Sequence, residues 1–293
     1  MAKISRILMP VDFSDRCLGM THYARAIAEK YDAEIILLHV VNPVFIAPDI
    51  GMAPPAIVAV PQWLITEKAK LLDEFATTEL AGLRVRRLVY EGIPEMQIAE
   101  MAKSEDASLL IMPTHGYGVF RRFLIGSVAA KVLDDVKCPV LTGVHMEKHV
   151  LDGKAAFSVV ACALDLKARS AETLLQAAHL AQDFGAKLAV VHVRPLQGQG
   201  GTANTADLQP QLEELVAGEL SKANLSFEPG RLASCVKSGD IDKSICGFAE
   251  GMGANLLVIG RDHGDEDGGK TSGRLRTHIY SIIRQASCPV LSI

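Results

Sequence analysis

Two glycines and a serine that follow an apolar segment have the spacing of a phosphate-binding loop. Nine residues separate Gly116 from Gly126-Ser127, and a helical pattern of apolar residues begins at this second pair. Backbone N–H groups at a helix N-terminus attract anions, and glycine lets the backbone approach them closely. The alternative is an ordinary strand-to-helix connection, where glycine is also common. This stretch alone does not decide between the two.

Two aspartates and three histidines are the other candidates for chemistry. Asp12 and Asp165 each end an apolar segment. There a carboxylate can bind a ligand or metal, act as a base, or cap the next helix. Together with the glycine loop, a ligand role is favoured for Asp12, and both roles stay open for Asp165. His39 and His192 are interpreted as structural, whereas His115 lies in the loop and stays open as a ligand contact. No nucleophile with a partner base stands out.

Composition excludes several classes of protein. The chain has 293 residues, is 49% hydrophobic and 22% charged, and has a formal net charge of −4. No basic run stands out, so neither nucleic acid nor a membrane surface is expected as a partner. No apolar run reaches the ~18 residues of a membrane helix, and no signal peptide is expected at the N-terminus. The six cysteines form no C-x-x-C pair, which favours a reduced, cytoplasmic setting over disulfides or zinc.

The chain is an internal duplication. Five landmarks recur in the same order at offsets between 147 and 153 residues: Asp12 with Asp165, His39 with His192, Gly92 with Gly239, Leu109 with Leu256, and Cys138 with Cys288. A unit of about 145 residues is too long for a solenoid repeat and has the size of a domain. We therefore expect two domains, at residues 1–147 and 154–293.

Each unit alternates apolar strands with helices. The first half predicts strands at 4–12, 34–41, 83–90, 109–112 and 138–141, and helices at 15–31, 62–80, 94–103 and from 126. The second half predicts strands at 157–165, 186–193, 231–237, 255–260 and 289–293, and helices at 169–184, 208–223, 240–250 and 275–285. Ser14 is the expected N-cap of the first helix. Residues 42–61 contain five prolines, which argue against regular structure over most of that stretch.

This pattern predicts an α/β fold of two tandem, doubly wound, parallel five-stranded sheets, Rossmann-like, with strand order 3-2-1-4-5. In such sheets the ligand binds beyond the carboxyl ends of the strands, where the strand order reverses. That point lies between strands one and four. Asp12 ends the first strand and the loop from Pro113 follows the fourth, so the fold brings the aspartate and the glycine loop together.

Both halves resemble the universal stress protein family. The features that carry the resemblance are Pro10-Val11-Asp12, Leu38-His39-Val40, Glu91-Gly92-x-Pro94, His115-Gly116 with Gly126-Ser127, and Cys138-Pro139-Val140. The resemblance implies ATP or another adenine nucleotide as cofactor. It places Val11, Asp12 and Val40 around adenine and Met112 and His115 near the ribose and phosphates. Pro113, at the first glycine position of the family signature, is also expected among the binding residues. It places Gly116, Gly126, Ser127 and Val128 at the phosphates. Arg121 and Arg122 could add charge, although a solvated pair is favoured.

Two departures from the family signature matter. Pro113 stands where the first signature glycine is expected, and proline lacks an N–H donor. In the second half, Arg276 and Thr277 replace the Gly-Ser pair. The loop before them carries four carboxylates: Asp262, Asp265, Glu266 and Asp267. These repel phosphate unless a cation such as Mg²⁺ intervenes. We therefore expect nucleotide binding in the first half. In the second half, Asp165, Val193, Gly260 and Thr277 form at most a degenerate site.

The resemblance also implies pairing of domains through their last strands, edge to edge. Two units in one chain would then form an internal pseudo-dimer, and two chains a homodimer. The leading hypothesis is an ATP-binding sensor or binding module of the stress response, with at most slow ATP hydrolysis. The alternative is a scaffold or protective protein that binds no nucleotide and acts through an unknown protein partner. A nucleotide-activating enzyme is disfavoured, because Phe13-Ser14-Asp15 replaces the glycine-rich loop such enzymes carry after strand one.

Overall fold

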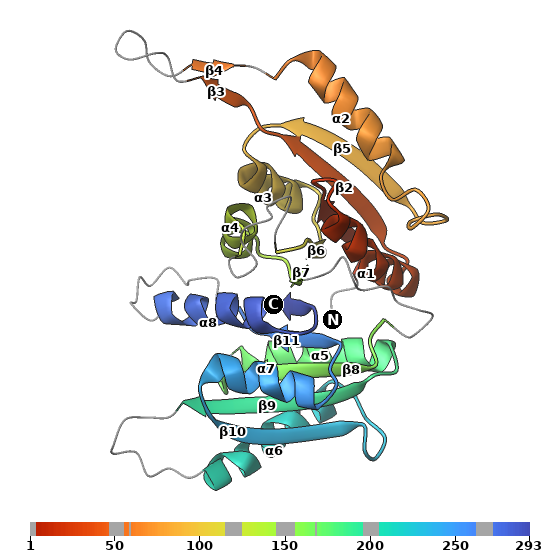
Figure 1. The fold of residues 1–293 in the computed structure, drawn as a ribbon. Coiled ribbons are helices and arrows are strands. Elements are labelled where there is room, and N and C mark those ends of the chain that lie inside the picture. The colour runs from red at the N-terminus through yellow and green to blue at the C-terminus, as the bar shows by residue number, and fades with distance from the viewer. Residues whose placement is uncertain are drawn as a thin grey trace, which may run out of the picture.

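The computed structural model describes residues 4–46, 56–58, 60–114, 125–144, 156–167, 169–195, 205–261 and 272–293. Its main feature is a ten-stranded sheet with the order β10-β9-β8-β11-β12-β7-β6-β1-β2-β5 (Figure 1). Each half of this sheet is parallel and has the predicted order 3-2-1-4-5. The predicted fold class is therefore confirmed.

The first half supplies strands and helices close to the expected ranges. They are β1 (Arg6–Pro10), α1 (Asp15–Tyr31), β2 (Glu34–Val41), α2 (Gln62–Glu74), β5 (Val85–Glu91), α3 (Pro94–Ser104), β6 (Leu109–Ile111), α4 (Ser127–Asp135) and β7 (Val140–Thr142). The Ser14 side chain accepts a hydrogen bond from the Cys17 amide and caps α1, as predicted.

The second half repeats the arrangement. It contains β8 (Val159–Leu164), α5 (Ser170–Asp183), β9 (Lys187–Pro195), α6 (Thr205–Lys222), β10 (Leu232–Gly239), α7 (Ile241–Gly251), β11 (Leu256–Ile259), α8 (Ser272–Gln285) and β12 (Val290–Ser292). Helix α8 begins three residues before the expected start at residue 275. Thr277 therefore lies inside the helix and not at its start.

The proline-rich stretch contains two short strands that the sequence did not predict. Strands β3 (Val44–Ile46) and β4 (Ala56–Val58) pair antiparallel and form a separate two-stranded sheet. Both strands avoid the prolines, so no ladder hydrogen bond is lost to a missing N–H. Helix α2 ends at Glu74 instead of residue 80, and the left-handed backbone of Ala76 (φ 54°) follows its end.

Both faces of the sheet are buried at its centre, because the central strands are apolar at consecutive positions rather than at every second one. On β1, Ile7 and Met9 belong to one core and Leu8 to the other. Helices α1, α2, α5 and α6 cover the first face, and α3, α4, α7 and α8 cover the second. This two-sided covering is what a parallel sheet requires.

The two halves join through their fifth strands. Strands β7 and β12 pair antiparallel, with Leu141 opposite Leu291, which confirms the expected edge-to-edge pairing. On one face, the Phe157 ring stacks on Tyr23 at 5.9 Å and meets Phe184 edge-on at 4.9 Å. The Tyr31 hydroxyl donates to Asp183 Oδ2 at 2.6 Å across the same boundary. The halves therefore share one hydrophobic core.

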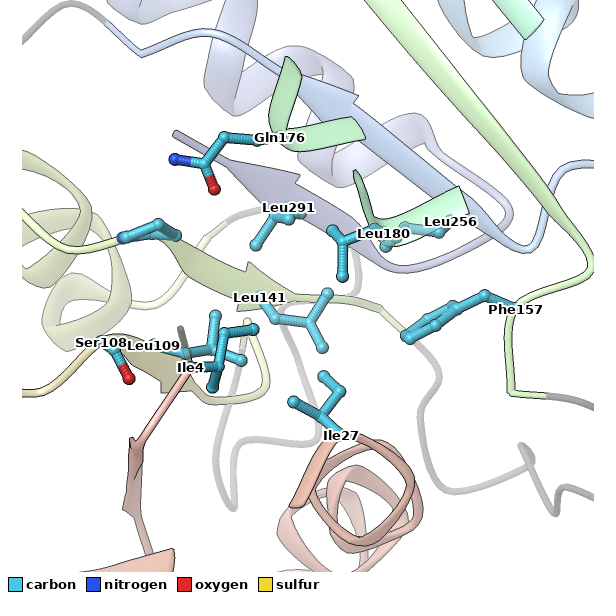
Figure 2. A pocket seen from close by; sticks show the side chains of 11 residues that line it. Ile4, Ile27, Ser108, Leu109, Leu141, Phe157, Gln176, Leu180, Leu256 and Leu291 are labelled. Carbon is cyan, nitrogen blue, oxygen red and sulfur yellow. The ribbon is translucent and has the colours of Figure 1, made fainter. Parts of the chain in front are cut away.

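Figure 2 shows a small cavity in that shared core, at the boundary between the two halves. Leu141 and Ile27 of the first half face Phe157, Leu180 and Leu291 of the second around a small cavity. Its volume is about 20 Å³, and its walls are almost entirely apolar. Apart from Ser108 and Gln176 the residues around it are apolar, so the halves meet here mainly through apolar side chains. Among the described helices, none is long and apolar enough to cross a membrane.

Candidate functional site

A cavity of about 320 Å³ opens at the carboxyl ends of β1, β2 and β6, where the strand order reverses. It is the position at which doubly wound sheets bind ligands. Eight of the predicted site residues line it: Val11, Asp12, Val40, Met112, Pro113, Gly126, Ser127 and Val128. His115 and Gly116 lie outside the described residues, as do Arg121 and Arg122. The fold thus brings together segments from four parts of the first half.

One oxygen of Asp12 is fixed by its own loop. Asp12 Oδ1 accepts from the Ser14 amide at 3.0 Å, the Ser14 hydroxyl at 2.6 Å and the Cys17 thiol at 2.9 Å. Burial raises the pKa of the Cys17 thiol, which keeps this donor protonated. Asp12 Oδ2 makes no hydrogen bond within the described part of the chain. The carboxylate is therefore held in place with one oxygen available to a ligand.

The turn after Asp12 depends on a backbone conformation that sequence reasoning did not anticipate. Phe13 is left-handed, with φ 65°, and its counterpart Leu166 in the second half has φ 58°. Such values are uncommon for bulky residues and carry a conformational cost. The Phe13 ring lies 4.5 Å from the His39 ring and 5.9 Å from Phe75, centroid to centroid. Aromatic packing therefore holds the turn that presents Asp12.

His39 is a structural element of the cavity wall. Its Nδ1 lies 2.7 Å from the Val11 carbonyl oxygen. Because a carbonyl only accepts, Nδ1 carries the proton. His192 makes the same contact to the Leu164 carbonyl at 2.8 Å. Each histidine thus ties strand two to the end of strand one, in agreement with the structural role expected for both.

A pH-dependent loss of stability is expected from His39. Burial lowers the pKa of this imidazole below 6.5, and the nearby Lys68 acts in the same direction. Below pH 6.5 the unfolded chain then binds more protons at this position than the folded chain, so stability falls as pH drops through this range. His39→Gln removes this contribution. The urea concentration at the unfolding midpoint should decrease more between pH 7.5 and pH 5.5 in the wild type than in His39→Gln. Equal decreases in the two proteins would contradict the prediction.

The N-terminus of α4 faces the same cavity. Gly126 occupies the N-cap position, and among the residues that the structure describes no side chain caps the first-turn amides. The Gly126 amide itself donates to the Thr114 carbonyl at 2.9 Å, which fixes where the helix begins. Ser127, the first helical residue, is exposed. Uncapped N–H groups at the positive end of a helix dipole bind anions.

Pro113 is compatible with this geometry. On either side of it, the Met112 amide donates to Leu141 at 3.1 Å and the Thr114 amide to Gly143 at 3.3 Å. These two donors are used by the sheet and not by the cavity. The Thr114 hydroxyl also bonds the Gly143 carbonyl at 3.2 Å. Thr114 lines the cavity as well but carried no motif signal in the sequence.

The second half has a cavity of about 310 Å³ at the matching position. Asp165, Val193 and Gly260 line it, whereas Thr277 is the sixth residue of α8 and its side chain is outside the described part. In a regular helix only the first four amides lack an intrahelical partner, so the Thr277 amide is committed to the helix. Asp165 Oδ1 accepts from the Lys167 amide and the Ser170 hydroxyl, and Oδ2 lies 3.4 Å from Lys167 Nζ. Both oxygens of this aspartate are occupied.

No metal centre is evident. Within the described ranges, no group of three or more His, Cys, Asp or Glu side chains is placed to hold an ion. The six cysteines are free thiols, and none is paired in a disulfide.

The second cavity has a further histidine contact besides that of His192. His278, which lines this cavity, has its Nδ1 2.5 Å from Asp242 Oδ1. Sequence reasoning missed this pair, because neither residue belongs to a motif.

The chain is similar in sequence to universal stress proteins. Universal stress protein MJ0531 of Methanocaldococcus jannaschii is 32% identical over 143 residues, which cover 46% of this chain and 79% of that protein. Universal stress protein MJ0577 of the same organism is 29% identical over 149 residues, covering 46% of this chain and 92% of that protein. Each relative matches about half of the chain, as expected for a duplication.

Among solved structures, a universal stress protein from Archaeoglobus fulgidus matches both halves together. It covers 99% of this chain and 96% of its own, with a TM-score of 0.71 and 22% identity. This likeness supports the fold. Another universal stress protein has been solved in complex with cAMP; it matches 47% of this chain, covers 97% of its own, and has a TM-score of 0.37 and 17% identity.

The model of the universal stress protein family matches the chain twice, at residues 3–142 and 156–293. The two matches coincide with the two halves of the sheet, and the relatives carry the same family description. The chain belongs to the universal stress protein family and carries two copies of its domain in tandem.

Proposed function

We propose that the first domain binds an adenine nucleotide, ATP, in the cavity between Asp12 and the N-terminus of α4. The observation that carries the proposal is the uncapped first turn of α4 facing the same cavity as a carboxylate with one available oxygen. The cavity volume of about 320 Å³ is in the range of small-molecule sites. Apolar side chains of Val11, Val40 and Met112 suit the faces of a purine.

The proposed role is that of a sensor or binding module in the cytoplasm rather than an efficient enzyme. Among the described residues that line the cavity, His39 has its Nδ1 committed to the Val11 carbonyl, and Asp12 has Oδ1 committed to its own loop. Among these described residues, neither side chain is positioned to act as a base on a nucleophile. We propose at most a slow hydrolysis of ATP, for which a bound Mg²⁺ would offset the charge of the phosphates. In this proposal Asp12 binds the ligand or its cation.

The proposal is tested by mass spectrometry of small molecules released from the purified, full-length protein. We expect ATP or another adenine nucleotide to be released from the wild type and lost when Gly116 and Gly126 are both replaced by valine. Circular dichroism of the variant checks that it is folded. Absence of any nucleotide, together with no shift of the melting temperature on adding ATP and Mg²⁺, would overturn the proposal.

That negative result would favour the second candidate, a scaffold that binds no nucleotide. The observation in its favour is Pro113, which removes one backbone donor from the edge of the cavity. The scaffold would act through protein contacts alone. A variant with the first cavity filled, for example Val40→Phe, distinguishes the two candidates. A scaffold would keep its protein contacts and its full function in this variant, whereas the nucleotide proposal expects the variant to be inactive.

We also propose a homodimer, formed through a surface other than the fifth strands. Strands β7 and β12 pair with each other within the chain, so neither is available to a second copy. The exposed apolar residues include Trp63 on α2 and Met96 on α3, which are 66% and 62% exposed. Light scattering of the purified protein is expected to give twice the chain mass of 31.5 kDa. A mass of one chain would contradict this prediction.

A further inference from the structure

The ten-stranded sheet ends in two edge strands, β10 in the second domain and β5 in the first. An edge strand presents backbone N–H and C=O groups that no neighbouring strand bonds. On β10, a side chain fills this edge. Gln209 of α6 accepts from the Val236 amide at 2.8 Å and donates to the Ser234 carbonyl at 3.1 Å. The side-chain amide thus takes the place of a neighbouring strand.

The matching groups of β5 have no such partner. The Ile35 amide of β2 donates to the Arg84 carbonyl at 2.9 Å, and the bonds alternate along the ladder from there. The even-numbered residues of β5 therefore face β2, whereas Arg87 and Val89 face away from it. These two residues match, one repeat earlier in the chain, the two that Gln209 bonds on β10. Among the described residues, no side chain bonds the Arg87 carbonyl or the Val89 amide.

Exposed apolar side chains gather around this open edge. Helix α2 lies beside β5 at the end of the sheet (Figure 1), and the Arg87 side chain donates to the Leu72 and Phe75 carbonyls at its C-terminus. Six large apolar side chains are exposed in the described part of the chain, and five of them belong to α2, to β5 or to the start of α3: Trp63, Leu71, Tyr90, Ile93 and Met96. Exposed apolar surface that is concentrated in one region marks an interaction site.

The sequence of β5 is complementary to itself when two copies run antiparallel. With the two-fold axis at Val89, Arg87 of one copy lies opposite Glu91 of the other, and Leu88 lies opposite Tyr90. These are an opposite-charge pair and an apolar pair, and both kinds stabilise neighbouring strands. Residues 87, 89 and 91 carry the outward backbone groups, so they form the hydrogen-bonded pairs. An axis at Arg87 would instead place two arginines opposite each other, which is unfavourable.

We propose that β5 pairs antiparallel with β5 of a second copy of the chain, with the axis at Val89, and joins the two ten-stranded sheets into one. This inference rests on the homodimer proposed above and names its surface. Charge complementarity selects a second copy as the partner, because each chain supplies both members of the Arg87–Glu91 pair. The assembly closes at two chains, since Gln209 fills the other edge of the sheet.

Charge reversal tests the pairing, with dissociation of the full-length dimer measured by sedimentation equilibrium. Glu91 is exposed, and Glu91→Arg places an arginine opposite Arg87 at two symmetric contacts. Arg87→Glu places a glutamate opposite Glu91 at the same two contacts. We expect each variant to dimerise about tenfold more weakly than the wild type, or weaker still. Lys237→Glu reverses an exposed charge on β10 and is the matched control, for which wild-type dimerisation is expected.

Mixing the two variants is the decisive measurement. A heterodimer of Glu91→Arg with Arg87→Glu has opposite charges at both contacts, so we expect a one-to-one complex with about the stability of the wild-type dimer. Mixing would not repair a structural defect in either variant. Circular dichroism checks that both are folded, and Glu91→Arg decides the question by itself if Arg87→Glu does not fold.

Two failures are distinguishable. A wild type that stays monomeric overturns the homodimer and this inference together. A wild-type dimer that persists unweakened in Glu91→Arg, or folded variants that form no heterodimer, overturns the assignment of the surface to β5 and leaves the homodimer standing. None of these results bears on whether the first domain binds ATP.

Discussion

Ser127→Asp is expected to weaken ATP binding by about 100-fold or more. The substitution places a carboxylate on the first residue of α4, at the point where the proposed phosphates meet the helix N-terminus. Two like charges about 4 Å apart repel by ~4 kcal/mol at the effective dielectric constant of a protein surface, and each ~1.4 kcal/mol is tenfold in affinity. Aspartate is favourable in the first turn of a helix, so the variant is expected to fold. Equilibrium titration with ATP measures the effect.

Two controls isolate the cause. Ser127→Ala removes the hydroxyl without adding charge and is expected to cost about tenfold or less, the worth of one hydrogen bond. Ser221→Asp adds the same charge on an exposed position of α6, in the other domain, and is expected to leave ATP affinity unchanged. If Ser127→Asp bound ATP as tightly as Ser221→Asp, the phosphates would not lie at α4 and the proposed site would be wrong.

Phe157→Ala is expected to lower the free energy of unfolding by about 3–5 kcal/mol, the usual cost of removing a buried phenylalanine. Phe157 is 1% exposed, and its ring contacts Tyr23 of the first domain and Phe184 of the second. The cavity left behind would extend the one shown in Figure 2, which already lies beside this ring. The loss therefore weakens the core that the two domains share. Urea unfolding followed by far-UV circular dichroism measures it.

Met96→Ala is the matched control for this experiment. Met96 is 62% exposed on α3, and truncation of an exposed side chain changes stability by about 0.5 kcal/mol or less. A loss of less than about 1 kcal/mol for Phe157→Ala would show that the interface between the domains repacks around the missing ring. The shared core would then contribute much less than its burial indicates.

The fold was predictable because its signals are local and are repeated. Continuous apolar segments such as residues 109–112 indicated buried parallel strands, and the copy at 256–259 indicated the same strand in a second domain. The ends of helices and strands were predicted less accurately. Helix α2 ends early because the backbone of Phe75 is extended and that of Ala76 is left-handed, and neither residue indicates such a turn. The β3–β4 hairpin pairs two short segments between prolines, and neither segment alternates clearly enough to indicate a strand.

The placement of residues in the first candidate site was predictable for a different reason. Asp12 and Gly126-Ser127 lie at element ends that a 3-2-1-4-5 sheet must bring together, so topology alone placed them in one cavity. Arg261, which follows β11 and contacts the first domain, was not predictable in this way. Its partners are carbonyls of Leu133 and Cys138, and any residue has a carbonyl. A contact made to the backbone across a domain boundary leaves no pattern in the sequence.

The pairing of β7 with β12 has a consequence for how the two sites could diverge. When two identical chains pair in this way, symmetry gives the pair two identical sites, and every substitution changes both. Here both partners of the strand pair belong to one chain, so a substitution changes only one site. Assembly of the pair is also intramolecular, so dilution does not separate the halves. The two cavities of a single chain can therefore diverge independently, while the halves that carry them stay joined at any protein concentration.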